Sequence, residues 1–384
     1  WQPADVIADV MKRYKADSVH SAFPYAPYGN ARDAELKSAG IELQQLGSSY
    51  AVAPGRVLKD DGTPYRVYTP FYRAWLAHGW RAPVAAPKNP QWVKPLKGDQ
   101  TIPHWKTPEG VNIQTAGEKA AIARFKDFLK RAAEDYGDAR NIPGIEGTSR
   151  LSPHLRWGEI HPRTILAALG QSKGHEVYRK EIAWREFYAD VLHNNPHTSR
   201  DYYDAKFKKM RYDKPGKKFE AWCAGKTGYP FVDAAMRQLV KEGWMHNRTR
   251  MVVASFLVKD LHIEWQHGAN FFMKYLIDND VASNSHGWQW TAGCGTTLRR
   301  ITEFSIPSNK VRDLILMVFI LGNLFQNWLI LKVMQYMNLG IQKKVIRMDM
   351  KNVLLIMQQK GLSRLLALKR SKRQNHSSLN CATN

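Results

Sequence analysis

Hydrophobic and polar positions follow two different patterns along the chain, and the change falls near residue 117. Before it, helical spacing of apolar side chains alternates with short strand-like runs: helices are expected at 4–14 and 31–40, and strands at 18–23, 41–43 and 51–53. Helices that alternate with strands predict an α/β domain around a partly parallel sheet, here with few strands.

From residue 117 onward the pattern predicts helix after helix, with expected helices at 118–136, 163–169, 176–193, 230–242 and 251–263. Between the two regions, residues 82–110 contain six prolines and almost no periodicity, which predicts a linker. We therefore expect a partial α/β domain at 1–81, a linker at 82–116, a helical domain at 117–296 and a distinct tail at 297–384.

Charge makes DNA the leading partner. The net charge of +23 is shared unevenly, because residues 1–296 hold 42 Lys and Arg against 31 Asp and Glu, or +11. A basic chain of this kind favours nucleic acid or an anionic membrane. Its three cysteines, Cys223, Cys294 and Cys381, lie far apart without metal-ligand spacing. This fits a reducing, cytoplasmic compartment and argues against a metal site.

The start of the chain shows no signal peptide, and a first residue Trp1 without a methionine indicates a fragment.

The helical region is dense in tryptophan, which packs a core or encloses a planar cofactor with equal ease. Its tryptophans are Trp157, Trp184, Trp222, Trp244, Trp265, Trp288 and Trp290. Spacing alone does not decide between these two uses.

The run Glu146–Ser152 places three hydroxyl side chains and Arg150 ahead of a helix. Hydroxyls and exposed N–H groups at a helix entry suit a pyrophosphate. The same run also reads as an ordinary capping segment, and taken alone that is the better interpretation.

Five further motifs follow in order: Glu181–Tyr188, Gly225–Pro230, Gly243–Arg248, Asp278–Asn284 and Gly287–Trp290. From about residue 136 to 296 this ordered set resembles the flavin domain of the photolyase/cryptochrome family. Pro64–Tyr72 resembles part of that family's antenna domain, with the first strands missing. The resemblance implies a truncated, Rossmann-like α/β domain followed by an all-helical FAD-binding domain. The closest resemblance is to the class I branch, which repairs cyclobutane pyrimidine dimers.

The resemblance implies FAD as the cofactor and assigns its contacts. Asn284 would face the flavin N5, and Arg250 would pair with Asp278. The residues assigned to FAD are Tyr136, Thr148, Ser149, Arg150, Leu151, Ser152, Arg250, Asp278, Asn279 and Asp280. Taken alone, Asn284 reads equally well as a loop cap.

A lesion must leave the duplex before a cofactor reaches it, and an apolar slot with indole walls suits the flipped pyrimidines. The resemblance places Trp184 and Trp290 at those walls, with Glu181 on the bases. The full set assigned to dimer-containing DNA is Glu181, Trp184, Arg185, Tyr188, Asn247, Arg248, Met251 and Trp290. No acid–base pair is required, since the excited reduced flavin donates an electron that later returns.

Trp265 and Trp288 match the inner two of the family's three electron-relay tryptophans. By spacing, the outer member falls near Tyr212, so the surface end of the relay departs from the family pattern. Both tryptophans also read as core packing. The antenna chromophore, a folate or a deazaflavin in relatives, stays open because Tyr28-Gly29-Asn30 lacks the folate binders' Asn-Glu pattern.

The tail departs from the family after Thr296. Leu314–Met334 reads as a membrane span by length and hydropathy. One base restored after the codon of Thr296 instead yields three strings in order that resemble the family's C-terminal region. We therefore interpret 297–384 as out-of-frame translation, and expect no membrane association. The expected protein is a monomeric light-driven lyase; the alternatives are a cryptochrome-like photosensor and an inactive product of a damaged gene.

Overall fold

The computed structural model describes residues 2–96 and 106–296. Two parallel strands, β1 (Val19–Ser21) and β2 (Leu43–Gln45), pair with Val19 opposite Leu43, and each follows a helix, α1 (Pro3–Tyr14) or α2 (Pro27–Ser38). The predicted α/β pattern is confirmed here, with the second strand two residues later than expected.

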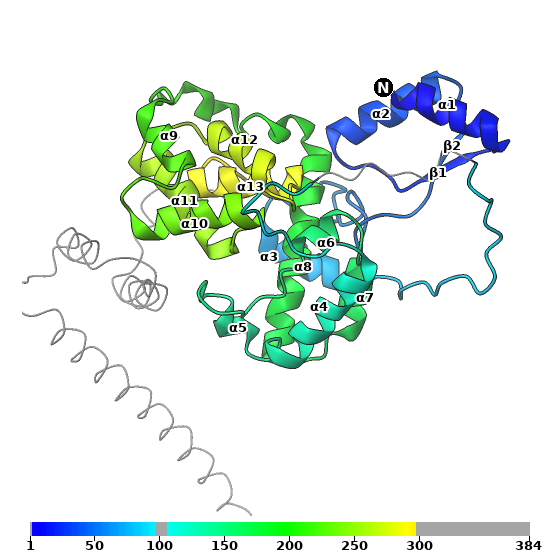
Figure 1. Cartoon of the computed structure of the whole chain (residues 1–384), viewed down its shortest axis with the longest axis horizontal. Coiled ribbons are helices and arrows are strands. Elements are labelled where there is room, and N and C mark those ends of the chain that lie inside the picture. Colours follow the sequence, from blue (N-terminus) through cyan, green and yellow to red (C-terminus); the bar gives the residue numbers. More distant parts are fainter. Residues whose placement is uncertain (1, 97–105, 297–384) are drawn as a thin grey trace, which may run out of the picture. The chain divides into compact units, whose positions relative to one another are not determined.

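The other regular elements of the described chain are helices (Figure 1). They are α3 (Tyr68–His78), α4 (Glu118–Arg131), α5 (Tyr136–Ala139), α6 (Ser152–Arg156), α7 (Pro162–Ala168), α8 (Lys173–Asn194), η1 (Pro196–Ser199), η2 (Ala205–Lys209), α9 (Lys217–Cys223), α10 (Pro230–Glu242), α11 (Asn247–Ser255), the π-helical turn η3 (Phe256–Asp260), α12 (Trp265–Tyr275) and α13 (Val281–Ala292). The helical domain expected from the sequence is confirmed.

Two predicted helices are each divided into two elements in the structure. The helix expected over 118–136 ends at Arg131, and Tyr136 begins a separate turn, α5. The helix expected over 251–263 begins earlier, because the His246 side chain accepts the backbone N–H of Arg248 and caps α11. It passes into η3 after Ser255.

The strand predicted at 51–53 is wrong. The backbone N–H groups of Ala51 and Val52 donate to the Glu186 carboxylate of α8 and are therefore not available to a sheet. The same carboxylate accepts the indole N–H of Trp75 at 2.6 Å. Burial raises the pKa of Glu186 although these three donors oppose the shift.

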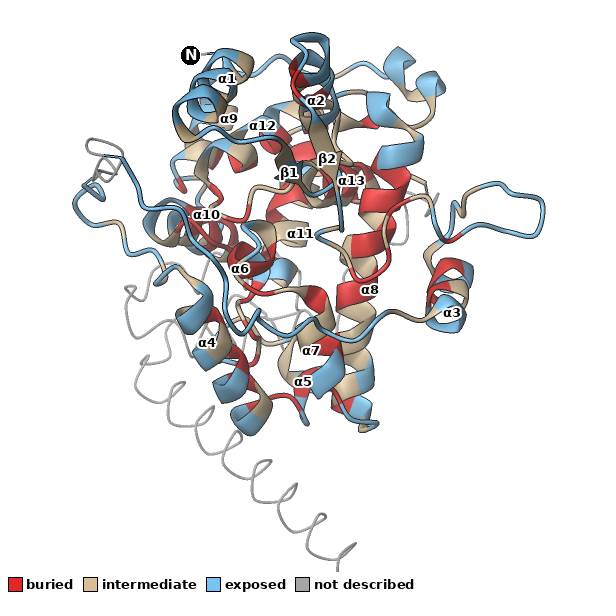
Figure 2. Ribbon diagram, turned by 90° about the vertical axis from the view of Figure 1, so that its right-hand side faces the viewer, coloured by how far each residue is buried: buried red, intermediate tan, exposed pale blue. Residues whose placement is uncertain are grey.

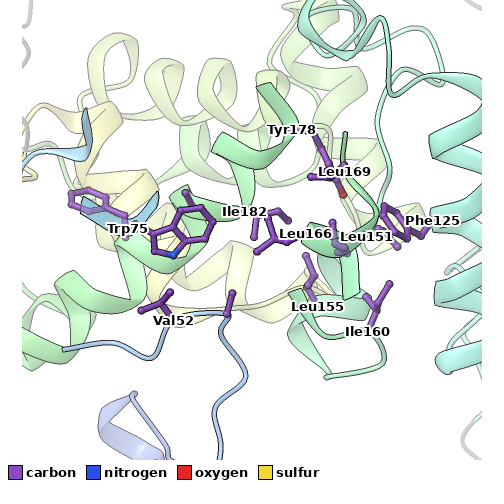
Figure 3. Packing of buried hydrophobic residues seen from close by; sticks show 14 of the residues in the cluster. Val52, Trp75, Phe125, Leu151, Leu155, Ile160, Leu166, Leu169, Tyr178 and Ile182 are labelled. Atoms are coloured by element: carbon purple, nitrogen blue, oxygen red, sulfur yellow. The ribbon is translucent and has the colours of Figure 1, made fainter. Parts of the chain in front are cut away.

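These contacts bring the segment after β2 into the helical core. Val52 and Trp75 belong to one buried cluster with Phe125, Leu151 and Ile182 (Figure 3). Helix α3 packs on α8, whose buried positions run along much of its length (Figure 2). The predicted boundaries at 81 and 116 remain predictions, and residues 51–78 share their core with the helices.

A second buried cluster lies among α9 to α13, and includes Trp222, Leu257, Trp265, Phe272 and Trp288. Among residues 2–96 and 106–296, none of the helices has both the length and the apolar character needed to cross a membrane. The run Leu314–Met334 and the frame interpretation of 297–384 lie outside the described residues.

Candidate functional site

Ser149 stands at the turn into α6. Its hydroxyl accepts the Tyr178 hydroxyl at 2.9 Å and the Leu151 backbone N–H at 3.3 Å, and Ser149 is itself buried. Arg150 has a φ of +50°, a left-handed conformation that a side chain rarely adopts. Through Tyr178, α8 thus holds this run in an unusual backbone conformation. An ordinary capping segment does not need such a conformation.

Arg150 and Ser152 join this turn to the motif that starts at Gly243. The Arg150 guanidinium lies 4.3 Å from the ring centre of Trp244 and pairs with Glu242 at 3.1 Å. The Trp244 indole N–H donates to the Ser152 hydroxyl at 3.2 Å. Two motifs about ninety residues apart in the chain therefore form one surface.

The loop before α13 contacts the residues that follow Ser152. The Trp157 indole donates to the Ile277 carbonyl at 2.7 Å, and Arg156 donates to the Asn279 carbonyl at 3.2 Å. Arg250 pairs with Asp278 at 2.7 Å and also donates to a backbone carbonyl of Met245. The Arg250–Asp278 pair expected from the sequence is present.

Asp278 has one carboxylate oxygen without a partner. Its side chain is 2% exposed, and Oδ1 is buried with no hydrogen-bond donor among the residues that the structure describes. Such a buried acceptor is costly unless a ligand supplies a donor. The FAD ribityl and ring systems carry such donors, so Asp278 and Arg250 fit this cofactor.

The remaining residues assigned to FAD surround these two motifs. The Asp280 carboxylate accepts the Ser283 backbone N–H and hydroxyl and caps α13. The Asn284 amide donates to the Ala269 carbonyl at 3.0 Å, which fixes it on α12. Tyr136 is buried, and burial raises its pKa, whereas Thr148 is half-buried.

One face of α8 carries several residues assigned to the lesion. Glu181, Trp184 and Tyr188 stand three and four positions apart and share that face. Glu181 forms an ion pair with Arg140, whose guanidinium lies 5.6 Å from the ring centre of Tyr136. Arg140 is not among the residues predicted from the sequence. Its nearness to Tyr136 along the chain is the only sequence signal that we find for it.

Arg248 lies against the same cluster. Its Nε donates to the Asn141 side chain at 3.0 Å, and its guanidinium reaches the Met251 sulfur at 3.5 Å. Burial and the nearby Arg140 lower the pKa of Arg248. The structure thus brings Glu181, Arg248 and Met251 together, while Asn247 is exposed at the start of α11.

Trp184 is stacked on Tyr68 of α3, with ring centroids 3.6 Å apart and planes at 7°. The Tyr68 hydroxyl donates to the Lys180 carbonyl at 2.7 Å, which holds the ring against α8. Tyr68 belongs to the family-like segment Pro64–Tyr72, but no role is predicted for it from the sequence. One indole face is therefore supported by the protein itself.

Arg185 and Trp290 have other surroundings. Arg185 donates to the carbonyls of Ser49 and Leu155, and its guanidinium lies 4.4 Å from the Tyr50 ring centre. These contacts fasten the loop before Ala51 to α8. Trp290 is half-buried near the end of α13, and the slot between Trp184 and Trp290 remains a prediction.

Trp265 and Trp288 lie in the second buried cluster, and Gly268 packs beside the Trp288 ring. A Cβ atom at Gly268 would fall 2.1 Å from the Trp288 ring, so only glycine lets this indole approach α12. Gly268 is one helical turn after Trp265. The indole N–H groups of both tryptophans are buried without an acceptor among the described residues.

His246 belongs to the Gly243–Arg248 motif and couples this region to pH. Burial, helped by Arg248, Arg250, Arg150 and Arg140, lowers its pKa from 6.5 to about 4. Its Nδ1 accepts the Arg248 backbone N–H and must stay unprotonated to do so.

We expect His246 to stabilise the fold above pH 6.5 and to lose this effect as the pH falls from 6.5 to 4, because the unfolded chain takes up the proton first. Between about pH 7.5 and about pH 5 the loss should be about 2 kcal/mol. Urea unfolding at both pH values measures it. In His246→Asn, which keeps a capping oxygen but does not titrate, the pH-dependent loss should shrink by that amount. An equal loss in both proteins would contradict the assignment.

A cavity of about 350 Å³ lies beside α2 and β2. It is lined by Phe23, Tyr25, Asn30, Asp33, Gln45 and His193 among others. Within the described part of the chain, no group of His, Cys, Asp or Glu side chains is arranged to hold a metal ion.

Comparisons with known proteins give a consistent result. A family model described as the FAD binding domain of DNA photolyase matches residues 178–314, and one described as DNA photolyase matches residues 1–90. The deoxyribodipyrimidine photo-lyase of a Synechococcus strain is 38% identical over 338 residues, which cover 81% of this chain and 69% of the relative.

Two solved structures are also similar. A bacterial class III photolyase from Agrobacterium tumefaciens has a TM-score of 0.67 and 35% identity, covering 78% of this chain and 66% of that one. A Synechocystis cryptochrome has a TM-score of 0.68 and 27% identity, covering 81% and 69%. The chain thus spans about two thirds of the length of these proteins.

Proposed function

Because the chain belongs to the DNA photolyase family, we propose that it is a light-driven lyase that splits cyclobutane pyrimidine dimers in DNA with FAD as its cofactor. Its relatives carry the name deoxyribodipyrimidine photo-lyase, and this name supports repair over signalling. We also propose that it belongs to the class I branch of the family.

One observation carries this function. Arg140 contacts both Tyr136, which we assign to the flavin, and Glu181, which we assign to the lesion. The residues assigned to the cofactor and those assigned to the lesion are therefore linked through the Arg140 side chain. Electron transfer from a cofactor to a base requires this nearness, whereas a protein that only stores flavin does not.

The flavin side of the site supplies fixed charges. Arg250 and Asp278 face each other at 2.7 Å, and the unpartnered Asp278 oxygen would accept a donor from FAD. The Ser149 and Ser152 hydroxyls and the backbone around Arg150 would hold the phosphates. When bound, FAD supplies the light-excited electron donor. The pair of charges beside it tunes that donor.

The lesion side orients the flipped bases. Glu181 is a hydrogen-bond acceptor for base N–H groups, and its ion pair with Arg140 holds it in place. Trp184, backed by Tyr68, presents a rigid indole to the dimer. Met251 adds an apolar contact that adapts to shape. Arg248 is suited to a phosphate that flanks the lesion.

We expect Trp184→Ala to weaken binding of dimer-containing DNA by about 1–3 kcal/mol, the usual worth of a base–aromatic stack. Binding of undamaged DNA should change little, because that binding depends on phosphate contacts. Fluorescence anisotropy with matched damaged and undamaged duplexes measures both affinities.

Trp92→Ala is the matched control, since Trp92 is 82% exposed in the predicted linker. It should leave both affinities unchanged. If Trp184→Ala weakened binding of the two duplexes equally, Trp184 would not contact the lesion.

A further inference from the structure

Tyr202 is an aromatic neighbour of Trp265. The ring centroids of Tyr202 and Trp265 are 6.1 Å apart with planes at 86°, and both rings are buried, at 3% and 1% exposure. Trp265 opens α12, and Tyr202 follows η1, so the contact joins two distant segments. Tyr202 is therefore placed to donate an electron directly to Trp265.

The Tyr202 hydroxyl is hydrogen-bonded to a base. It donates to the Glu264 carboxylate at 2.8 Å, and the Tyr212 hydroxyl is a second partner. Burial, together with these two neighbours, raises the pKa of Tyr202. Tyrosine gives up an electron readily only when its proton can leave at the same time, and Glu264 is placed to accept it.

Trp265 has no comparable proton acceptor among the described residues. Its Nε1 is buried, and none of the residues that the structure describes accepts its proton. Once oxidised, this indole therefore keeps its N–H proton and remains a radical cation, which oxidises more strongly than the deprotonated radical. The contrast between an indole that cannot lose its proton and a phenol that can sets the direction of transfer.

We propose that Tyr202 reduces oxidised Trp265 while Glu264 takes the phenolic proton, so that the relay leaves the core through tyrosines rather than a third tryptophan. This inference rests on the proposed function, because it requires that Trp288 first gives one electron to a photo-excited oxidised flavin and that Trp265 then refills Trp288.

In the proposed step, one electron passes from the phenol of Tyr202 to the Trp265 radical cation and restores the neutral indole. The O–H bond of Tyr202 breaks, and a new O–H bond forms on Glu264. Tyr202 is left as a neutral radical. A thiol from solution returns a hydrogen atom to the phenol, and Glu264 releases its proton to water.

Tyr212 stands where spacing places the outer relay member, and its hydroxyl interacts with that of Tyr202, the neighbour of Trp265. It is half-buried, with its hydroxyl near the Met210 sulfur at 3.7 Å and its ring 5.5 Å from that of His262. We assign Tyr212 as the next step towards solvent, after Tyr202.

The test is electron paramagnetic resonance on the FAD-loaded, oxidised 384-residue chain, frozen under illumination. Samples are made with and without ring-deuterated tyrosine, since deuteration narrows a tyrosyl signal and leaves a tryptophanyl signal unchanged. We expect a tyrosyl radical in the unmutated chain. Tyr202→Phe keeps the ring against Trp265 and should lose this signal, with a tryptophanyl radical left. Glu264→Gln should lose it as well.

Tyr212→Phe should retain a tyrosyl radical, and Tyr28→Phe, at a residue 77% exposed, is the control for unrelated tyrosines. A tyrosyl signal that persists in Tyr202→Phe but vanishes in Tyr212→Phe would overturn the assignment, as would an unchanged signal in Glu264→Gln. FAD absorbance after gel filtration shows that each variant is folded.

Dimer repair after chemical reduction of the flavin is measured on the same samples and does not use the relay. Its absence in the unmutated chain would contradict the proposed function. Its presence without a tyrosyl radical would contradict only the tyrosine exit.

Discussion

Asp278→Asn is expected to lower the free energy of unfolding by about 3–5 kcal/mol, the usual cost of breaking a buried ion pair from one side. The Asp278 side chain is 2% exposed and pairs with Arg250 at 2.7 Å, so the substitution leaves Arg250 without its counter-ion. The second oxygen of Asp278 is the unpartnered buried acceptor that we assign to FAD. We therefore also expect FAD retention to be lost.

Urea unfolding of the flavin-free chain measures the first effect, and absorbance after gel filtration measures the second. Asp204→Asn is the matched control, because Asp204 caps η2 outside the site and asparagine preserves a cap. Full FAD retention by a folded Asp278→Asn protein would show that this carboxylate does not hold the cofactor.

Trp288→Phe is expected to abolish the light-driven reduction of oxidised flavin in this chain. A phenyl ring gives up an electron far less readily than an indole, while it keeps most of the packing against Gly268 and Phe272. Repair by chemically reduced protein should be retained, since that electron does not come from Trp288. Absorbance spectra recorded under illumination with a thiol measure the reduction.

Trp222→Phe is the matched control for Trp288→Phe. Trp222 is also fully buried and lies 6.2 Å from Trp288, yet it has no place in the proposed relay. Photoreduction should persist in this variant. If it persisted in Trp288→Phe as well, Trp288 would be a packing residue only.

Much of the fold follows from local pattern. The helix at 230–242 and most of the helix at 173–194 are visible in the sequence, because each carries an uninterrupted helical spacing of apolar residues. The segment at 51–53 has the apolar character of a strand, but the Glu186 carboxylate takes its N–H groups. That interaction joins residues far apart in the sequence and leaves no local signal.

The candidate site divides in the same way. The family resemblance predicts the Arg250–Asp278 pair, and the structure contains it. The support of Trp184 by Tyr68 and the link from Glu181 to Arg140 depend on tertiary packing, which one sequence does not reveal. The same holds for Tyr202, which stands apart from every family-like motif and meets Trp265 only in the folded chain.

The most direct measurement is the removal of cyclobutane dimers from a defined duplex by the FAD-loaded, reduced 384-residue chain, in light and in darkness. Repair assayed by restored restriction cleavage should occur in light, be absent in darkness, and fall in Trp184→Ala. A chain that retains FAD but leaves the dimers intact in light would contradict repair and indicate a cryptochrome-like photosensor, and a chain that retains no FAD would contradict the cofactor site.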